Sequence, residues 1–102
     1  MKQYAFFGKF KTHDGTRDEL LSILLQAASL IENTKGCRLY MVSKDIKDAN
    51  TVCVNEVWDT KEDHDNSLKI EGAADLISKA MPLLNGRPES IELEVIGGKT
   101  IS

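Results

Sequence analysis

Four short apolar segments, separated by two stretches of helical periodicity, limit what this 102-residue chain can fold into. The first, residues 3–10 (QYAFFGKF), is short and rich in aromatic residues, as β-strands are. Residues 37–43 (CRLYMVS) and 51–58 (TVCVNEVW) are also short and mostly apolar, and residues 90–98 (SIELEVIGG) begin with alternating apolar and polar residues, so each predicts a strand. In residues 17–31, apolar side chains recur every three or four positions, which predicts an amphipathic helix, and residues 73–81 resume that pattern.

Local signals predict where the helices begin and end. Thr16 and Glu19 have the spacing of a capping box, in which the hydroxyl and the carboxylate each bond a free backbone amide. Gly36 supplies the left-handed turn with which helices commonly end, so we expect the first helix to close there. Thr60 is expected to begin a second helical segment, and Gly72 to break it.

The order of elements is therefore β-α-β-β-α-β, the split βαβ or ferredoxin-like plan. Right-handed crossovers place both helical segments on the same face of one antiparallel sheet. A chain of this length forms one core, so residues 1–102 are predicted to be a single α+β domain.

The helices can cover only one sheet face, so the other should be polar in a monomer. Instead, the first three predicted strands carry apolar residues on both sides: Tyr4, Phe6 and Phe10 against Ala5 and Phe7; Cys37, Leu39 and Met41 against Tyr40 and Val42; Val52, Val54 and Trp58 against Cys53 and Val57. An apolar face of this size is unusual on a monomer. We therefore predict a two-fold homodimer, paired sheet to sheet, in which Glu92 and Glu94 stay polar or reach a basic group across the interface.

Composition excludes several classes of partner. A net charge of −3 without a basic patch argues against nucleic acid and anionic lipid. The chain has no apolar run long enough for a membrane span and no signal-peptide pattern, so we expect a cytoplasmic protein.

Cys37 and Cys53 fall on adjacent predicted strands, where they could be neighbours; without a secretion signal they are expected to be free thiols.

Four segments together resemble the antibiotic biosynthesis monooxygenase (ABM) family of dimeric α+β barrel proteins: GTRDELLSILLQAA, GCRLYMVSKDIKDANTVCVNEVWDTKEDHDNSL, AMPLL and ELEVIGG. The resemblance implies a ferredoxin-like protomer, pairing of two sheets into a barrel, and a small pocket between sheet and helices. Characterised members include oxygenases of polycyclic phenols and quinols that use no metal, flavin or haem. It therefore implies a cofactor-independent monooxygenase that acts on a small aromatic, phenolic or quinol-type substrate with molecular oxygen.

The same resemblance supplies a catalytic candidate, because Glu56, Trp58 and His64 match the family's E-x-W…H arrangement. His64 falls in the first turns of the second helix, where the positive end of the helix dipole favours a neutral, basic imidazole. Its acidic neighbours Asp63 and Asp65 act in the opposite direction. A surface histidine on a polar helix is the alternative interpretation.

Three further residues are candidates for substrate binding. Trp58 ends a strand just before a helix, where it can serve as core, as substrate contact or as both. Tyr40 can hydrogen-bond a phenolic substrate or be an ordinary sheet residue. Asn55 and Glu56 are polar in a strand that looks buried, so each needs a partner; Arg38 is a candidate partner for Glu56.

No metal site is predicted, because the only two histidines are about fifty residues apart and neither has a carboxylate at the i, i+4 spacing of a helical metal site. No cofactor is expected either. The alternative to an enzyme is a non-catalytic dimeric protein of the same fold that binds a small apolar metabolite. Haem degradation, which relatives perform on this scaffold, is disfavoured because residues 3–10 lack the asparagine that the haem-degrading subgroup carries in its first strand.

Overall fold

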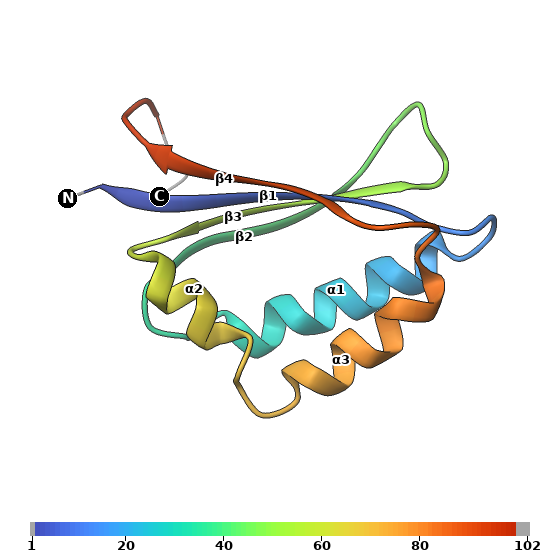
Figure 1. The fold of residues 1–102 in the computed structure, drawn as a ribbon, viewed down its shortest axis with the longest axis horizontal. Helices are drawn as coiled ribbons and strands as arrows, with labels where there is room; N and C mark the ends of the chain where they lie inside the picture. Colours follow the sequence, from blue (N-terminus) through green and yellow to red (C-terminus); the bar gives the residue numbers. More distant parts are fainter. Residues whose placement is uncertain (1, 100–102) are drawn as a thin grey trace.

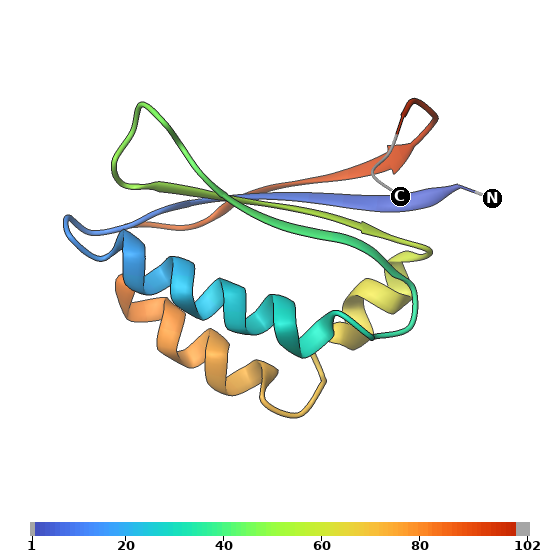
Figure 2. The ribbon, with the colours of Figure 1, turned by 180° about the vertical axis from the view of Figure 1, so that it is seen from behind.

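The computed structural model describes residues 2–99 and shows a four-stranded antiparallel sheet with the helices on one face (Figures 1 and 2). The elements are β1 (Gln3–Lys11), α1 (Arg17–Ile31), β2 (Cys37–Lys44), β3 (Thr51–Trp58), α2 (Lys61–Ser67), α3 (Ala73–Ala80), the 3₁₀ turn η1 (Met81–Leu83) and β4 (Glu89–Val95). The strand order β2-β3-β1-β4 confirms the predicted ferredoxin-like α+β protomer. Between residues 2 and 99, no helix is both long and apolar enough to cross a membrane.

The predicted helix boundaries are partly correct. Thr60 caps α2 by accepting a hydrogen bond from the Asp63 amide at 3.0 Å, and Gly72, at φ +96°, separates α2 from α3. Thr16 does precede α1, but the predicted capping-box bonds are wrong. Its hydroxyl instead donates to the carbonyls of His13 and Leu83, which ties the loop before α1 to η1. The first helix ends at Ile31 rather than at Gly36.

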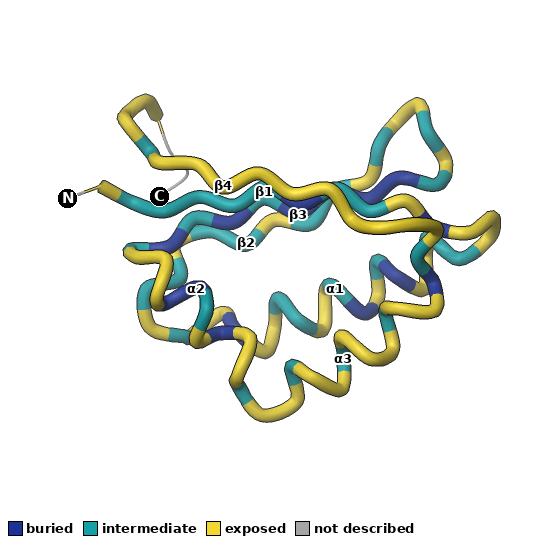
Figure 3. The backbone as a smooth tube through the Cα atoms, in the orientation of Figure 1, coloured by how far each residue is buried: buried dark blue, intermediate teal, exposed yellow. Residues whose placement is uncertain are grey.

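The hydrophobic core lies between β3 and α1. Val52 and Val54 of β3 are buried, and Leu20 and Ile23 of α1 pack with Val52 and Leu83. Figure 3 shows this burial along β3 and on the inward side of α1, while α3 lies along α1 farther from the sheet. Alternate residues of β3 face the helices, so the strand runs Val52, Val54, Glu56, Trp58 along its buried face. A carboxylate therefore occupies the middle of an otherwise apolar row.

The sheet face away from the helices is also apolar, as predicted. It carries Ala5, Phe7, Leu39, Met41, Cys53, Val57, Ile91, Leu93 and Val95. In the single chain, 40% of Met41, 55% of Ile91 and 49% of Leu93 are exposed. We call these nine residues the outer face.

One residue departs from the predicted faces. A register shift between Cys37 and Leu39 sets Cys37 opposite Trp58, so Cys37 lies on the helix side. Cys53 lies on the outer face. Both cysteines are free, as predicted. They are not neighbours, because the β2–β3 register sets Cys37 opposite Trp58 and Cys53 opposite Ser43, at the two ends of the strand pair.

Helix α2 packs directly on the backbone of Gly36. Gly36 has φ +83°, and its carbonyl accepts the Asp59 amide at 2.8 Å. A Cβ placed there would lie 2.1 Å from Oδ2 and 2.8 Å from Cβ of the buried Asp63. Because the Asp63 Cβ is fixed to α2, the helix could not make room without moving. Gly36 thus sets how closely the first turn of α2, and with it His64, approaches the sheet.

We predict that Gly36→Ala destabilises the protein by about 3 kcal/mol, since it combines backbone strain with a steric clash. Gly15→Ala is the matched control, because Gly15 has φ +80° but a Cβ added there would meet nothing within 4 Å. That control carries only the left-handed backbone cost of about 1 kcal/mol. Urea unfolding of both variants measures the difference. Equal losses would show that α2 does not depend on this close approach.

Candidate active site beneath helix α2

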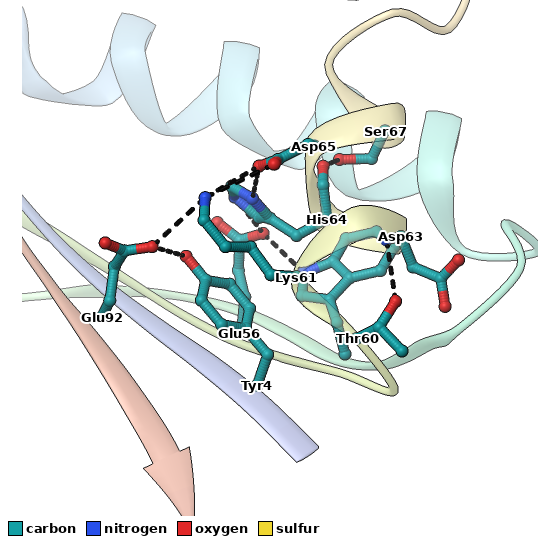
Figure 4. A network of polar contacts seen from close by, with 10 residues as sticks. Tyr4, Glu56, Thr60, Lys61, Asp63, His64, Asp65, Ser67 and Glu92 are labelled. Carbon is teal, nitrogen blue, oxygen red and sulfur yellow. Dashed lines mark hydrogen bonds and ion pairs between the residues drawn. The ribbon is translucent and has the colours of Figure 1, made fainter. Parts of the chain in front are cut away.

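Helix α2 covers the end of the sheet where β3 finishes, and the side chain of His64 points from the helix toward the sheet (Figure 4). Only two residues, Asp59 and Thr60, separate β3 from α2, so the helix folds back over the strand that it follows. Asp63, His64 and Ser67 form its buried side. His64 is 8% exposed and lies over the helix face of β1 and β3 (Figure 4).

Three aromatic rings enclose the imidazole of His64. The Phe6 ring stacks on it, with centroids 5.0 Å apart and planes at 24°. The Tyr4 ring lies 5.3 Å away at 49°, and the Trp58 ring meets it edge-on at 6.0 Å. Tyr4 and Phe6 are brought there by the β1–β3 register, which sets them opposite Trp58 and Glu56. Burial among these rings keeps water away from the imidazole.

Each nitrogen of His64 faces a carboxylate. Nδ1 is 3.1 Å from Oδ1 of Asp65, and Nε2 is 3.9 Å from Oε1 of Glu56. The hydrogen bond from His64 lowers the pKa of Asp65, so this carboxylate is ionised near neutral pH. Since an ionised carboxylate only accepts hydrogen bonds, Nδ1 carries the proton. In a neutral ring Nε2 is then the free base.

Glu56 is 9% exposed and lies between Phe6 of β1 and Tyr40 of β2. Its Oε1 accepts a hydrogen bond from the indole Nε1–H of Trp58 at 3.0 Å. Burial raises the pKa of Glu56, while the Trp58 hydrogen bond and nearby His64 act against that rise. The predicted pairing of Glu56 with Arg38 is wrong. The bulge leaves Arg38 exposed, and its guanidinium binds both oxygens of Asp59, at 2.7 and 2.9 Å.

A second set of polar contacts closes the exposed side of the cluster. The Tyr4 hydroxyl donates to Oε2 of Glu92 at 2.9 Å, and burial together with this contact raises the pKa of Tyr4. Nζ of Lys61 lies 3.4 Å from Oε2 of Glu92 and 3.4 Å from Oδ2 of Asp65. Glu92 therefore faces the helices and meets a basic group in its own chain. It stays polar, which was one of the two alternatives expected from the sequence, and within this chain its partner does not lie across an interface. Exposed pairs of this kind contribute little stability.

The structure brings three of the four candidate residues together. Tyr40 and Trp58 flank Glu56, and His64 lies above it. Burial, and secondarily the charge of Glu56, raises the pKa of Tyr40, so its hydroxyl stays a hydrogen-bond donor. Asn55 lies on the opposite side of β3, between Phe7 and Met41 of the neighbouring strands, and does not join the cluster.

Sequence reasoning missed Tyr4 and Phe6 as parts of this site. Their shared face was visible from their alternation, but nothing local set them opposite Trp58 and Glu56. Asp65 was recognised only as an acidic neighbour of His64.

Two shallow grooves lie elsewhere on the surface, on the helices. One groove follows α1 and the other lies between α1 and α3; their lining residues are Asp18, Leu21, Ser22, Leu25, Gln26, Ser29, Leu30, Gly72, Asp75, Leu76 and Lys79. Neither groove borders the His64 cluster, so the expected pocket between sheet and helices stays a prediction. Across residues 2–99, no three His, Cys, Asp or Glu side chains are grouped so that they could hold a metal ion.

We predict that Trp58 and Glu56, which share a hydrogen bond, contribute non-additively to the free energy of unfolding. Trp58→Phe leaves the buried carboxylate without its donor and should destabilise the fold by about 2–4 kcal/mol. Glu56→Leu leaves the indole N–H unpaired. Removing both partners avoids an unpaired polar group, so the double variant should recover about 1 kcal/mol or more relative to the sum of the single losses. Urea unfolding gives all three values, and strict additivity would contradict the coupling.

Comparison with known proteins places the chain in a family. Residues 4–77 match the model of the family described as "Antibiotic biosynthesis monooxygenase". No curated protein matches the sequence. A solved structure from Chloroflexus aurantiacus J-10-fl, named a "putative Antibiotic biosynthesis monooxygenase", is 35% identical, with 98% of this chain and 99% of that chain covered and a TM-score of 0.87.

Two more distant solved structures share the fold. A protein of unknown function from Nitrosomonas europaea is 22% identical over 100% of this chain and 97% of that one, with a TM-score of 0.83. A structure from Caulobacter crescentus CB15, also named for antibiotic biosynthesis monooxygenase, is 14% identical over 93% and 91% of the two chains, with a TM-score of 0.86. The family model matches most of the chain, and the Chloroflexus protein shares both its fold and 35% of its sequence. The chain therefore belongs to the antibiotic biosynthesis monooxygenase family.

Proposed function

We propose that this protein is a cofactor-independent monooxygenase of a small phenolic or quinol-type aromatic compound. One observation carries the proposal: His64 is enclosed by aromatic rings, its Nδ1 is held 3.1 Å from an ionised carboxylate, and its Nε2 is thereby left as a base. Family membership supports the oxygenase class. The aromatic rings around His64 offer stacking partners that suit a flat aromatic substrate.

The first step is removal of the substrate's hydroxyl proton by Nε2 of His64. The Asp65 carboxylate stabilises the imidazolium that forms, in the way that a carboxylate commonly supports a catalytic histidine. Enclosure by Tyr4, Phe6 and Trp58 keeps water from solvating the base and the new phenolate. Tyr40, whose hydroxyl remains protonated, is the proposed donor to the phenolate oxygen.

The phenolate is electron-rich enough to reduce molecular oxygen, so the substrate itself is the reductant. One oxygen atom bonds to a ring carbon, which loses its hydrogen, and the O–O bond then breaks. The other oxygen atom leaves as water, taking one hydrogen from that carbon and one from the original hydroxyl. A phenol and one O₂ thus give a quinone and one water, and the substrate supplies all four electrons.

The corresponding prediction compares the chain's only two histidines. His64→Gln should lower turnover by about 100-fold or more, the usual contribution of a general base. His13→Gln is the control, because His13 is an exposed residue of the loop after β1. Oxygen consumption with a panel of hydroquinones and naphthols measures both.

If no member of a broad panel is turned over above background, the monooxygenase proposal fails. Binding of panel members without turnover by the native protein, unchanged in His64→Gln, would instead favour the non-catalytic small-molecule-binding protein.

We also propose that the protein is a homodimer paired through the outer face. The apolar residues there are contiguous across all four strands, and burial contributes about 25 cal/mol per Å² of apolar surface removed from water. A second copy related by a two-fold axis presents the same apolar surface, which makes the face self-complementary. The His64 cluster lies on the other side of the sheet, so pairing leaves it free.

We expect the native protein to sediment as a two-chain species at micromolar concentration. Val57→Lys places a charge in the centre of the outer face, between Ala5 and Leu39, and should yield a single chain of 11.3 kDa. Leu25→Lys is the matched control, since Leu25 is 58% exposed on α1, away from the outer face. A native protein that remains a monomer would contradict the proposal.

A further inference from the structure

Nε2 of His64 and Oε1 of Glu56 face each other across a gap with no donor between them. Their separation of 3.9 Å is too long for a direct hydrogen bond. Trp58 donates to Oε1 from the strand side, and Asp65 holds the opposite edge of the imidazole. Glu56 and His64 are each more than nine-tenths buried, so bulk water does not readily compensate for the missing donor.

Protonation decides whether this arrangement is stable. Because Asp65 fixes the proton on Nδ1, a neutral ring turns a lone pair toward Glu56. An ionised Glu56 turns another lone pair back. Two buried acceptors that face each other without a donor are unfavourable. A single added proton, on either Nε2 or the carboxyl group, converts the pair into donor and acceptor.

The surroundings of the pair favour that proton. Its ionisable neighbours come from every element packed against it: Tyr4 from β1, Cys37 and Tyr40 from β2, Lys61 and Asp65 from α2, and Glu92 from β4. Tyr4, Cys37 and Tyr40 are neutral, with pKa values raised by burial. The one cation, Lys61, lies between two carboxylates. The local charge is therefore negative, and a proton reduces it.

We propose that Glu56 and His64 bind one proton between them, and that Glu56 is a positioning residue that sets the pH above which His64 becomes a free base. The catalytic part of this inference rests on the proposed monooxygenase function. Glu56 strengthens His64 as a base, because the imidazolium formed by proton transfer from a substrate lies between two carboxylates. The resting pair must first lose its own proton, so turnover increases as pH rises through the titration of the pair.

The test observes both partners of the pair without a substrate. NMR of ring-labelled histidine follows His64, with His13 as internal reference, and the fluorescence of Trp58, the chain's only tryptophan, reports on the carboxylate that its indole binds. In the native protein, both signals should change at one common midpoint. Glu56→Gln should move the His64 midpoint to lower pH by about one unit or more, a tenfold loss of proton affinity. Glu62→Gln removes the same charge from the exposed side of α2 and should leave the midpoint in place.

Distinct midpoints for His64 and Trp58 in the native protein would overturn the shared proton, whether or not Glu56→Gln folds. An unchanged His64 midpoint in a folded Glu56→Gln protein would overturn it equally. These readings do not require turnover, so they separate this inference from the proposed function. Where a substrate is turned over, the rising limb of its pH profile should share the native midpoint and shift with Glu56→Gln. If the rising limb of the pH profile does not shift in Glu56→Gln, Glu56 has no role in catalysis.

Discussion

The carboxylate of Glu56, buried in an apolar strand, is the constraint around which this end of the molecule is organised. Its neighbours on the same face of β3 are Val54 and Trp58, which offer one polar group, the indole N–H. A buried carboxylate needs more than one partner. Helix α2 places His64 beside the carboxylate, with Nε2 3.9 Å from Oε1, and Gly36 allows the helix to come that close to the sheet. The order of β3, a two-residue turn and α2 therefore serves the polar cluster as much as the core.

The sheet separates this cluster from the surface proposed for dimerisation. Asn55 and Glu56 are adjacent in sequence but lie on opposite faces, because side chains alternate along a strand. Glu56 faces the helices, and Asn55 lies among the apolar residues of the outer face. The proposed chemistry on one side and the proposed association on the other can therefore be tested by separate substitutions, even though the residues concerned occupy the same strands.

Much of the fold could be predicted because it depends on local patterns. The order of elements, the Thr60 cap, the break at Gly72 and the two apolar sheet faces all follow from periodicity or from single residues. The errors arise where the structure depends on partners distant in sequence. Because of a bulge at Arg38, Cys37 lies on the helix side of the sheet, and Arg38 forms a hydrogen-bonded ion pair with Asp59 instead of with Glu56. No alternation within the second strand predicts a register shift against the third.

The candidate site shows the same division between local and distant information. Around His64, the local sequence contains two opposed influences, a helix N-terminus and acidic neighbours, and does not rank them. In the folded chain, each imidazole nitrogen of His64 lies near a different carboxylate. Nδ1 contacts Asp65, and Nε2 faces Glu56 of the preceding strand. The carboxylate that faces Nε2 is thus not one of the helix neighbours of His64. It is a strand carboxylate, and only the packing of α2 onto β3 makes its influence on the imidazole specific.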